Sequence, residues 1–324
     1  MLVWIIFLCA ILLFLALDLG IINKTPHVIS TREASKWTAI WVGLSFAFSG
    51  VIYWLYDQGL IANPTALTPA VAMTKYITGY LIELSLSIDN IFIIAIIFSS
   101  FRIPAKYQHR VLFWGILSAI IFRALMIFFG IIIINKFTWS TYVFGAFLLF
   151  TAIKMLFTKN EKEYNPKKSL VYRIVSKIIP TTSTTDGEKF FIRKEDGRRY
   201  ATPLFVSLMV IEVMDIVFAV DSVPAILAIT SDPFLVFSSN IFAILGLRSM
   251  YFFLANMLEK FSYLEYSLIA ILSFVGIKML IHDYVKFDEW VSLAFIAMSM
   301  IAGILISVRK RPKISKEKGL KKVP

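Results

Sequence analysis

The sequence predicts an all-α fold, a polytopic transmembrane helix bundle of about nine spans that contains an inverted repeat of three-helix units. Three observations support this: apolar blocks of eighteen or more residues, basic charge that alternates between successive connections, and two segments with the same order of polar residues. Hydrophobic residues make up 58% of the 324 residues, against roughly 45–50% in an ordinary soluble domain. Mean hydropathy is +0.77. Lipid is therefore the expected main solvent.

The apolar blocks are long enough to cross a hydrocarbon layer of about 30 Å as helices. The first block has no basic residue before it, so we interpret it as a retained span and not as a secretion signal. The predicted spans lie near 2–22, 38–56, 71–100, 111–134, 140–157, 203–230, 234–258, 265–284 and 290–308.

The net charge of +12 is distributed as membrane topology requires. Of the 33 Lys and Arg residues, 26 fall in one alternate set of connections and the C-terminal tail, and 3 fall on the opposite side. The positive-inside rule then predicts an N-terminus outside and a C-terminus in the cytoplasm, in a bacterial inner membrane. Nucleic acid is not needed to explain the charge, and membrane lipid is the expected partner of the basic tail.

Two segments, 71–157 and 203–281, repeat one order of features. In each, an acid is followed six residues later by Asp and then by a small oxygen-bearing residue: Glu83, Asp89 and Asn90, then Asp215, Asp221 and Ser222. The next span carries a mid-span arginine, and the third ends in Ile-Lys-Met-Leu at Lys154 and Lys278. Because a unit has an odd number of spans, the second copy is predicted to be inverted. Lys154 and Lys278 then lie near opposite membrane faces, where each can reach headgroups.

The repeat organises the chain into six regions. These are a leading helix pair (1–56), a first three-helix repeat (57–157), a basic cytoplasmic linker (158–202), a second repeat (203–284), a final transmembrane helix (285–308) and a basic cytoplasmic tail (309–324). Within the linker, Phe190 to Arg193 and Arg198 to Ala201 flank Lys-Glu-Asp-Gly, which predicts a hairpin.

Five acids lie inside predicted spans: Glu83, Asp89, Glu212, Asp215 and Asp221. One Asp at a helix centre costs about 2.5–3.5 kcal/mol, so these side chains are expected to face the bundle interior. Arg123 and Arg248 are the candidate charge-balancing residues, which leaves a deficit of three. A divalent cation plus a proton would cancel this deficit. The alternative is a set of Arg–carboxylate pairs that lock helices together, with the surplus acids protonated.

The predicted ligands are all oxygen atoms. Pro224 removes a backbone hydrogen bond, so we expect a helix break that frees a carbonyl beside Asp221. Carboxylates, Asn90, Ser222 and such a carbonyl suit Mg²⁺, Ca²⁺ or Mn²⁺. Cys9 is the only cysteine, so a thiolate metal cage is excluded and no prosthetic group is expected. No Ser/His pair or HExxH motif falls inside spans, which argues against an enzyme.

Four motifs mix charged and apolar residues within spans. They begin at Glu83 (ELSLSIDNIF), Tyr107 (YQHRVLFWGI), Phe218 (FAVDSVPA) and Ser239 (SNIFAILGLR). In these motifs the sequence closely resembles the TerC family, particularly its Alx branch, over roughly residues 4–308. The resemblance implies an inner-membrane manganese exporter built from inverted three-helix repeats, with Glu83, Asp89, Asp215 and Asp221 as motif acids. Glu212 lies three residues before Asp215, in the acidic span of the second repeat.

The sequence thus favours secondary export of a divalent cation, most of all Mn²⁺ and alternatively Ca²⁺, in exchange for protons carried by the buried carboxylates. The rival function is a membrane factor that does not transport but assists insertion or assembly of other proteins, because plant members of the resembled family are linked to thylakoid assembly. The family is also associated with tellurite resistance, so metal or tellurite stress resistance by another mechanism stays open. The sequence does not determine the oligomeric state.

Overall fold

The computed structural model describes residues 2–17, 29–63, 65–137, 139–157, 170–184, 186–194, 197–255, 264–285 and 288–309. Its elements in chain order are α1 (Leu2–Leu17), α2 (Thr31–Asp57), α3 (Pro69–Ser100), α4 (Ala105–Lys136), α5 (Ser140–Phe157), α6 (Leu170–Ile178), β1 (Phe191–Arg193), β2 (Arg199–Ala201), α7 (Pro203–Leu227), α8 (Pro233–Ala255), α9 (Leu264–Leu280) and α10 (Glu289–Arg309).

Seven helices of the described residues are long and apolar enough to cross a membrane: α2, α3, α4, α5, α7, α8 and α10. The chain is therefore an all-α polytopic membrane protein, as predicted. The shorter α1 and α9 occupy two further predicted spans. The total of nine crossings stays a prediction.

Several helices begin where the sequence supplies a cap followed by proline. Pro69 and Pro203 occupy the first turn of α3 and α7, where a missing N–H costs no helical hydrogen bond. The Thr68 hydroxyl accepts from the Val71 amide at 3.4 Å, and Asp232 accepts from the amide of Phe234 at 3.0 Å. These local signals fix where α3, α7 and α8 enter the bundle.

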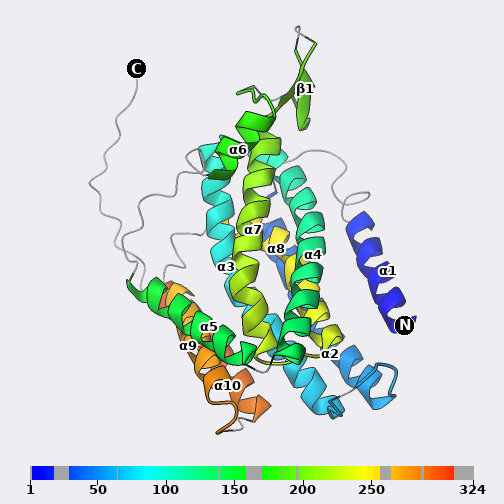
Figure 1. Ribbon diagram of the computed structural model, residues 1–324. Helices are drawn as coiled ribbons and strands as arrows, with labels where there is room; N and C mark the ends of the chain where they lie inside the picture. The colour runs from blue at the N-terminus through cyan, green and yellow to red at the C-terminus, as the bar shows by residue number, and fades with distance from the viewer. Residues whose placement is uncertain are drawn as a thin grey trace.

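An upright group of α3, α4, α7 and α8 forms the centre of the molecule, and α5, α9 and α10 form a second group beside it (Figure 1). Across the two predicted repeats, α3 packs on α8 as α4 packs on α7, while α3 with α7, α4 with α8 and α5 with α9 pair like with like. Exchanging the two units would leave this set of contacts unchanged. The contacts are compatible with the predicted repeat, which stays a prediction.

Close helix approaches show relative directions. Gly115 of α4 lies against Ile211 of α7, and Gly130 lies against Leu227, so α4 and α7 run parallel. On α5, a side chain at Gly145 would come within 3.0 Å of the Gly276 carbonyl of α9. Small residues therefore allow the backbones of α5 and α9 to touch, as is common between membrane helices.

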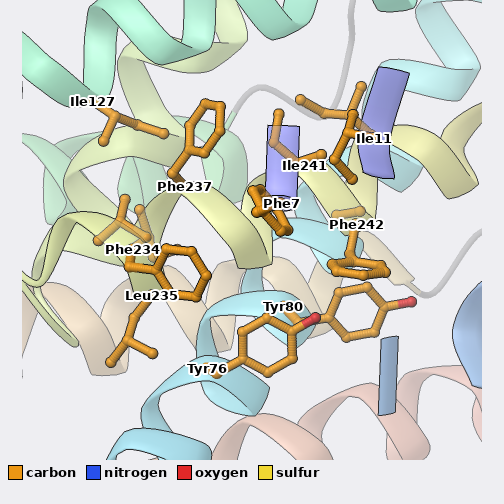
Figure 2. Close-up of a cluster of buried hydrophobic side chains, with 14 of the residues drawn as sticks. Phe7, Ile11, Tyr76, Tyr80, Ile127, Phe234, Leu235, Phe237, Ile241 and Phe242 are labelled. Atoms are coloured by element: carbon orange, nitrogen blue, oxygen red, sulfur yellow. The ribbon is translucent and has the colours of Figure 1, made fainter. Parts of the chain in front are cut away.

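Aromatic side chains attach the first helix to the bundle (Figure 2). Phe7 of α1 lies 5.4 Å from Phe234 and 6.2 Å from Phe237 of α8, measured between ring centroids. Phe242 of α8 in turn lies 6.3 Å from Tyr76 of α3. On the outer surface of the bundle, large apolar side chains such as Phe128 are exposed, as expected for positions that face lipid.

The linker contains the predicted hairpin and one helix that was not predicted. β1 and β2 pair antiparallel, with Phe191 opposite Ala201, which confirms the hairpin. The extra helix, α6, packs on α7 near the end where α7 begins (Figure 1). The Arg110 guanidinium of α4 joins the hairpin region through an ion pair of 2.9 Å with Glu188.

A partly buried ionic group, here called the Glu289 cluster, consists of Lys75, Lys278, Glu289 and Ser292. Lys75 Nζ lies 2.8 Å from one Glu289 oxygen and donates to the Ile229 carbonyl at 2.6 Å. Lys278 Nζ lies 3.3 Å from the other Glu289 oxygen and 2.9 Å from the Ser292 hydroxyl.

The cluster corrects one prediction. Lys278 was expected to reach headgroups, but its side chain is buried. The reason is that the Glu289 carboxylate at the start of α10 provides a nearby counter-charge. Lys154, its counterpart in the first repeat, is exposed as predicted.

Candidate cation-binding site

The centre of the bundle is organised by the buried guanidinium of Arg123 on α4, which is 1% exposed. It donates to the Glu83 carboxylate of α3, to Asp215 Oδ1 of α7 at 3.2 Å and to Asn240 Oδ1 of α8 at 2.9 Å. The Ser222 hydroxyl of α7 lies 3.4 Å away. We call these five residues the Arg123 cluster. One side chain thus joins four helices, and two of the predicted ligand acids, one from each repeat.

Pairing around this guanidinium is incomplete, since Arg123 Nε has no hydrogen-bond partner among the described residues. Four carboxylate oxygens of the surrounding acids likewise have none: Glu83 Oε2, Asp215 Oδ2 and both carboxylate oxygens of Glu212. Three carboxylates and one guanidinium carry a formal charge of −2. Leaving such groups unpaired in a dry interior is costly, so the site requires protons or a cation.

A small cavity of about 30 Å³ lies beside three of these oxygens, those of Glu212 and Asp215. Its polar lining consists of Asn90 of α3 with Glu212 and Asp215 of α7, and Met214 also lines it. A single water needs about 10–15 Å³ by this measure, so the space suits one small ion or about two waters. Gly115 of α4 preserves the space, because a Cβ there would lie 3.6 Å from Glu212 Oε1.

Helix geometry explains which polar residues of α7 lie on the same face of the helix. Residues seven apart lie about 20° from one another around a helix, whereas residues six apart lie about 120° apart. Ser222 therefore shares the face of Asp215. Asp221 does not, and its Oδ1 accepts a hydrogen bond of 3.1 Å from Thr151 of α5.

The predicted helix break at Pro224 is wrong. α7 continues through this proline to Leu227, and the Ala228 amide donates to the Pro224 carbonyl at 3.0 Å. Because Pro224 stands in the last turn of α7, it deletes one hydrogen bond without a long helical segment beyond it to redirect.

Two predicted site residues, Asp89 and Arg248, are not assigned to the Arg123 cluster. Asp89 belongs to α3 by its backbone, but its side chain lies outside the described part of the structure. Arg248 is buried on α8 and is 8% exposed. Among the described side chains, no group of three His, Cys, Asp or Glu residues gathers as a metal site. The structure thus combines two acids with an amide at the cavity and brings a third acid to Arg123.

Sequence reasoning missed two partners of the site. Asn240 stands in the middle of α8 and accepts from Arg123, and Thr151 of α5 donates to Asp221. The signal for Asn240 was available, because an amide in the middle of an apolar span is costly unless it is hydrogen bonded. Thr151 had no such signal, since a threonine can bond to its own helix.

Glu212 also faces a second space. A groove of about 690 Å³ between α4, α6 and α7 is lined by Glu212 together with apolar side chains that include Trp114, Ile174 and Val213. Glu212 therefore stands between the internal cavity and a groove on the side of the bundle.

Sequence comparison finds relatives of this chain. The sequence model described as "Integral membrane protein TerC family" matches residues 68–314. An "Uncharacterized membrane protein STKORF319" of Myxococcus xanthus is 49% identical over 309 residues, covering 95% of this chain and 92% of the relative. A "Putative membrane-bound redox modulator Alx" of Escherichia coli strain K12 is 42% identical over 322 residues, covering 98% of each chain. No solved structure matches the chain.

Proposed function

This chain belongs to the TerC family of integral membrane proteins, and from that premise we propose that it is a secondary transporter that exports divalent metal cations, with Mn²⁺ as its main substrate, in exchange for protons. The observation that carries the proposal is a set of buried carboxylate oxygens without partners, of which those of Glu212 and Asp215 belong to residues that line an ion-sized cavity. One divalent cation, or two protons, would cancel the charge of −2. The same acids can therefore hold either substrate in turn.

The donor set favours a hard cation. Carboxylate and amide oxygens from Asn90, Glu212 and Asp215 are the ligands that Mg²⁺, Ca²⁺ and Mn²⁺ prefer. Met214 adds a thioether to the cavity wall, and this softer donor favours a transition metal such as Mn²⁺ over Ca²⁺. Glu83 and Ser222 complete the polar surroundings through Arg123. Asp89 and Asp221 are included in this proposal as site acids because they belong to the family motif.

Energetics supports proton exchange. Moving two positive charges outward against an inside-negative potential costs about 4.6 kcal/mol per 100 mV, at about 2.3 kcal/mol per charge. Without a coupled energy source, the membrane potential would therefore drive the cation inward. A proton gradient directed inward can supply this free energy, and the orientation proposed for the chain, with its basic linker and tail in the cytoplasm of a bacterial inner membrane, gives export the required direction.

The relative from Escherichia coli carries the name redox modulator, so a redox role is the second candidate. In this chain Cys9 is the only cysteine, so no dithiol pair is available for exchange. A redox effect would then follow from the metal content of the cytoplasm. A membrane factor that assists assembly is the third candidate, and it does not require the buried acids to bind a cation.

Transport by inside-out membrane vesicles tests the proposal. Vesicles containing the chain should take up Mn²⁺, and uptake should collapse when the pH gradient is dissipated. Glu212→Gln and Asp215→Asn should each lower uptake at least tenfold while the protein stays folded. Asp57→Asn, which neutralises an exposed acid at the end of α2, is the matched control and should transport normally. Uptake indifferent to the pH gradient would refute proton coupling, and normal uptake by both core variants would refute the role given to these acids. Uptake no greater than that of vesicles without the chain would favour the assembly factor.

A further inference from the structure

The groove between α4, α6 and α7 is a different space from the cation cavity, and Glu212 is the one described residue that lines both. Along α7 it extends from Leu208 to Ile216, eight residues and therefore about 12 Å. That length is close to half of a hydrocarbon layer of about 30 Å. The α4 and α7 residues that line the groove, from Trp114 to Phe122 and from Leu208 to Ile216, lie mostly in the first half of each helix, and α6 packs on α7 at the same end of the bundle. It thus follows one leaflet of the membrane.

The groove wall is apolar and continuous with the lipid-facing surface. Trp114 and Ile121 of α4 and Val213 of α7 line it, and these side chains are 45%, 57% and 37% exposed. The volume of about 690 Å³ is more than twenty times that of the cation cavity and leaves room for a lipid acyl chain. Water does not fill an apolar groove in hydrocarbon. An acyl chain does.

Helix α6 forms the wall at the membrane surface and has three distinct faces. Tyr172 and Val175 pack on the core, and Ile174, which also lines the groove, and Ile178 are 46% and 73% exposed. The third face carries basic residues.

The basic face consists of Arg173 and Lys177, which are exposed, lie one helical turn apart and directly adjoin the isoleucine face. Neither forms an ion pair with a described residue, and α6 contains no acid. An apolar face beside a basic face is the pattern of a helix that lies in the headgroup layer. Arg173 and Lys177 lie on the same helix as Ile174, which lines the groove, so their positive charges are complementary to a negative headgroup whose acyl chain lies in the groove.

We propose that the groove between α4, α6 and α7 binds one anionic phospholipid, with its acyl chain against Trp114 and Val213 and its phosphate beside Arg173 and Lys177. The bound chain covers Glu212 from the side and keeps water and lipid-borne protons away from the internal cavity. Among the described residues, the groove shares only Glu212 with the cation ligands, and lipid binding does not depend on transport.

Lipid binding to the full-length protein tests the site. In detergent micelles, phosphatidylglycerol and phosphatidylcholine are added separately, and retained lipid is counted by native mass spectrometry while thermal unfolding is followed. We expect one phosphatidylglycerol molecule to be retained, with an affinity about tenfold or more above that for phosphatidylcholine, because each basic residue at a headgroup favours anionic lipid. Arg173→Glu with Lys177→Glu should abolish this preference. Arg193→Glu with Lys194→Glu, the same charge change on the hairpin, should leave it intact.

A second variant tests the groove itself. Val213→Trp places an indole in the groove and should exclude the retained lipid, whereas Val217→Trp, one turn further along α7 on an exposed position outside the groove lining, should not. Equal affinity for the two lipids, or retention unchanged by Val213→Trp, would overturn the proposal. A dimer of the unaltered protein that dissociates on Val213→Trp would also overturn it, because a second copy would then occupy the groove.

Discussion

The Glu289 cluster and the Arg123 cluster are two ionic groups with opposite ratios of carboxylates to cationic groups. In the Glu289 cluster one carboxylate lies between two ammonium groups, and each of its oxygens has a partner. In the Arg123 cluster one guanidinium serves two carboxylates, and one oxygen of each is left without a partner. The first arrangement ties α10 to both repeats. The second leaves negative charge over, which a proton or a cation would neutralise, so the two clusters differ in whether their carboxylate oxygens are all paired.

Removing the central cation should give the largest loss of stability. Arg123→Met leaves Glu83 and Asp215 without a counter-charge, which should cost about 3–5 kcal/mol of unfolding free energy, as when one partner of a buried ion pair is deleted. Denaturation in mixed micelles measures it. Lys106→Met, an exposed cation at the start of α4, should change the free energy by no more than about 0.5 kcal/mol. A loss below about 1 kcal/mol for Arg123→Met would mean that the acids are already protonated and that the two clusters do not differ in charge.

The saturated cluster should lose less, and without any effect on cation binding. Glu289→Gln removes the charge between Lys75 and Lys278, so about 2–3 kcal/mol should be lost, the range for hydrogen bonds to charged groups. The double variant Glu289→Gln with Lys278→Met should recover part of that loss, since it also removes a buried ammonium that has lost its counter-charge. Mn²⁺ binding by titration calorimetry should match the unaltered chain. Weakened Mn²⁺ binding by Glu289→Gln would contradict the distinction between the clusters.

Neutralising an unpaired acid should act in the opposite direction. Glu212→Gln removes a buried charge without a partner, so at neutral pH the cation-free protein should become more stable by about 1 kcal/mol. The same variant should lose the rise in melting temperature that Mn²⁺ gives the unaltered chain. Destabilisation of the cation-free protein would show that Glu212 has a structural partner after all.

The same comparison shows what the sequence could predict. The acids, Arg123 and the order of the repeated features were visible because charged residues inside apolar blocks are costly and must be buried together. The spans and the hairpin followed from apolar length and turn residues. The sites of contact did not follow, because they depend on which helix faces which: Asn240 reaches Arg123 from α8, and Asp221 turns to α5 once α7 runs straight through Pro224.

Lys278 shows the same limit from the other side. Lys154 and Lys278 end matching motifs, and their sequence environments are alike. Only the packing of α10, which lies outside the repeat, brings Glu289 to Lys278 and buries it. A repeat in sequence therefore predicts matched positions but not matched surroundings.

The smallest effects are expected when the same change, serine to alanine, is made in each cluster. Ser292→Ala removes an acceptor that lies 2.9 Å from the Lys278 ammonium, so it should cost about 1 kcal/mol of unfolding free energy and leave Mn²⁺ affinity unchanged. Ser222→Ala removes a hydroxyl at 3.4 Å from Arg123, too long for a strong hydrogen bond, and should cost less than about 0.5 kcal/mol. Its Mn²⁺ affinity should nevertheless fall severalfold, because the proposed site loses an oxygen ligand. If both serines changed stability alone, Ser222 would belong to the framework of the site and not to its ligands, and the difference between the clusters would rest on carboxylates only.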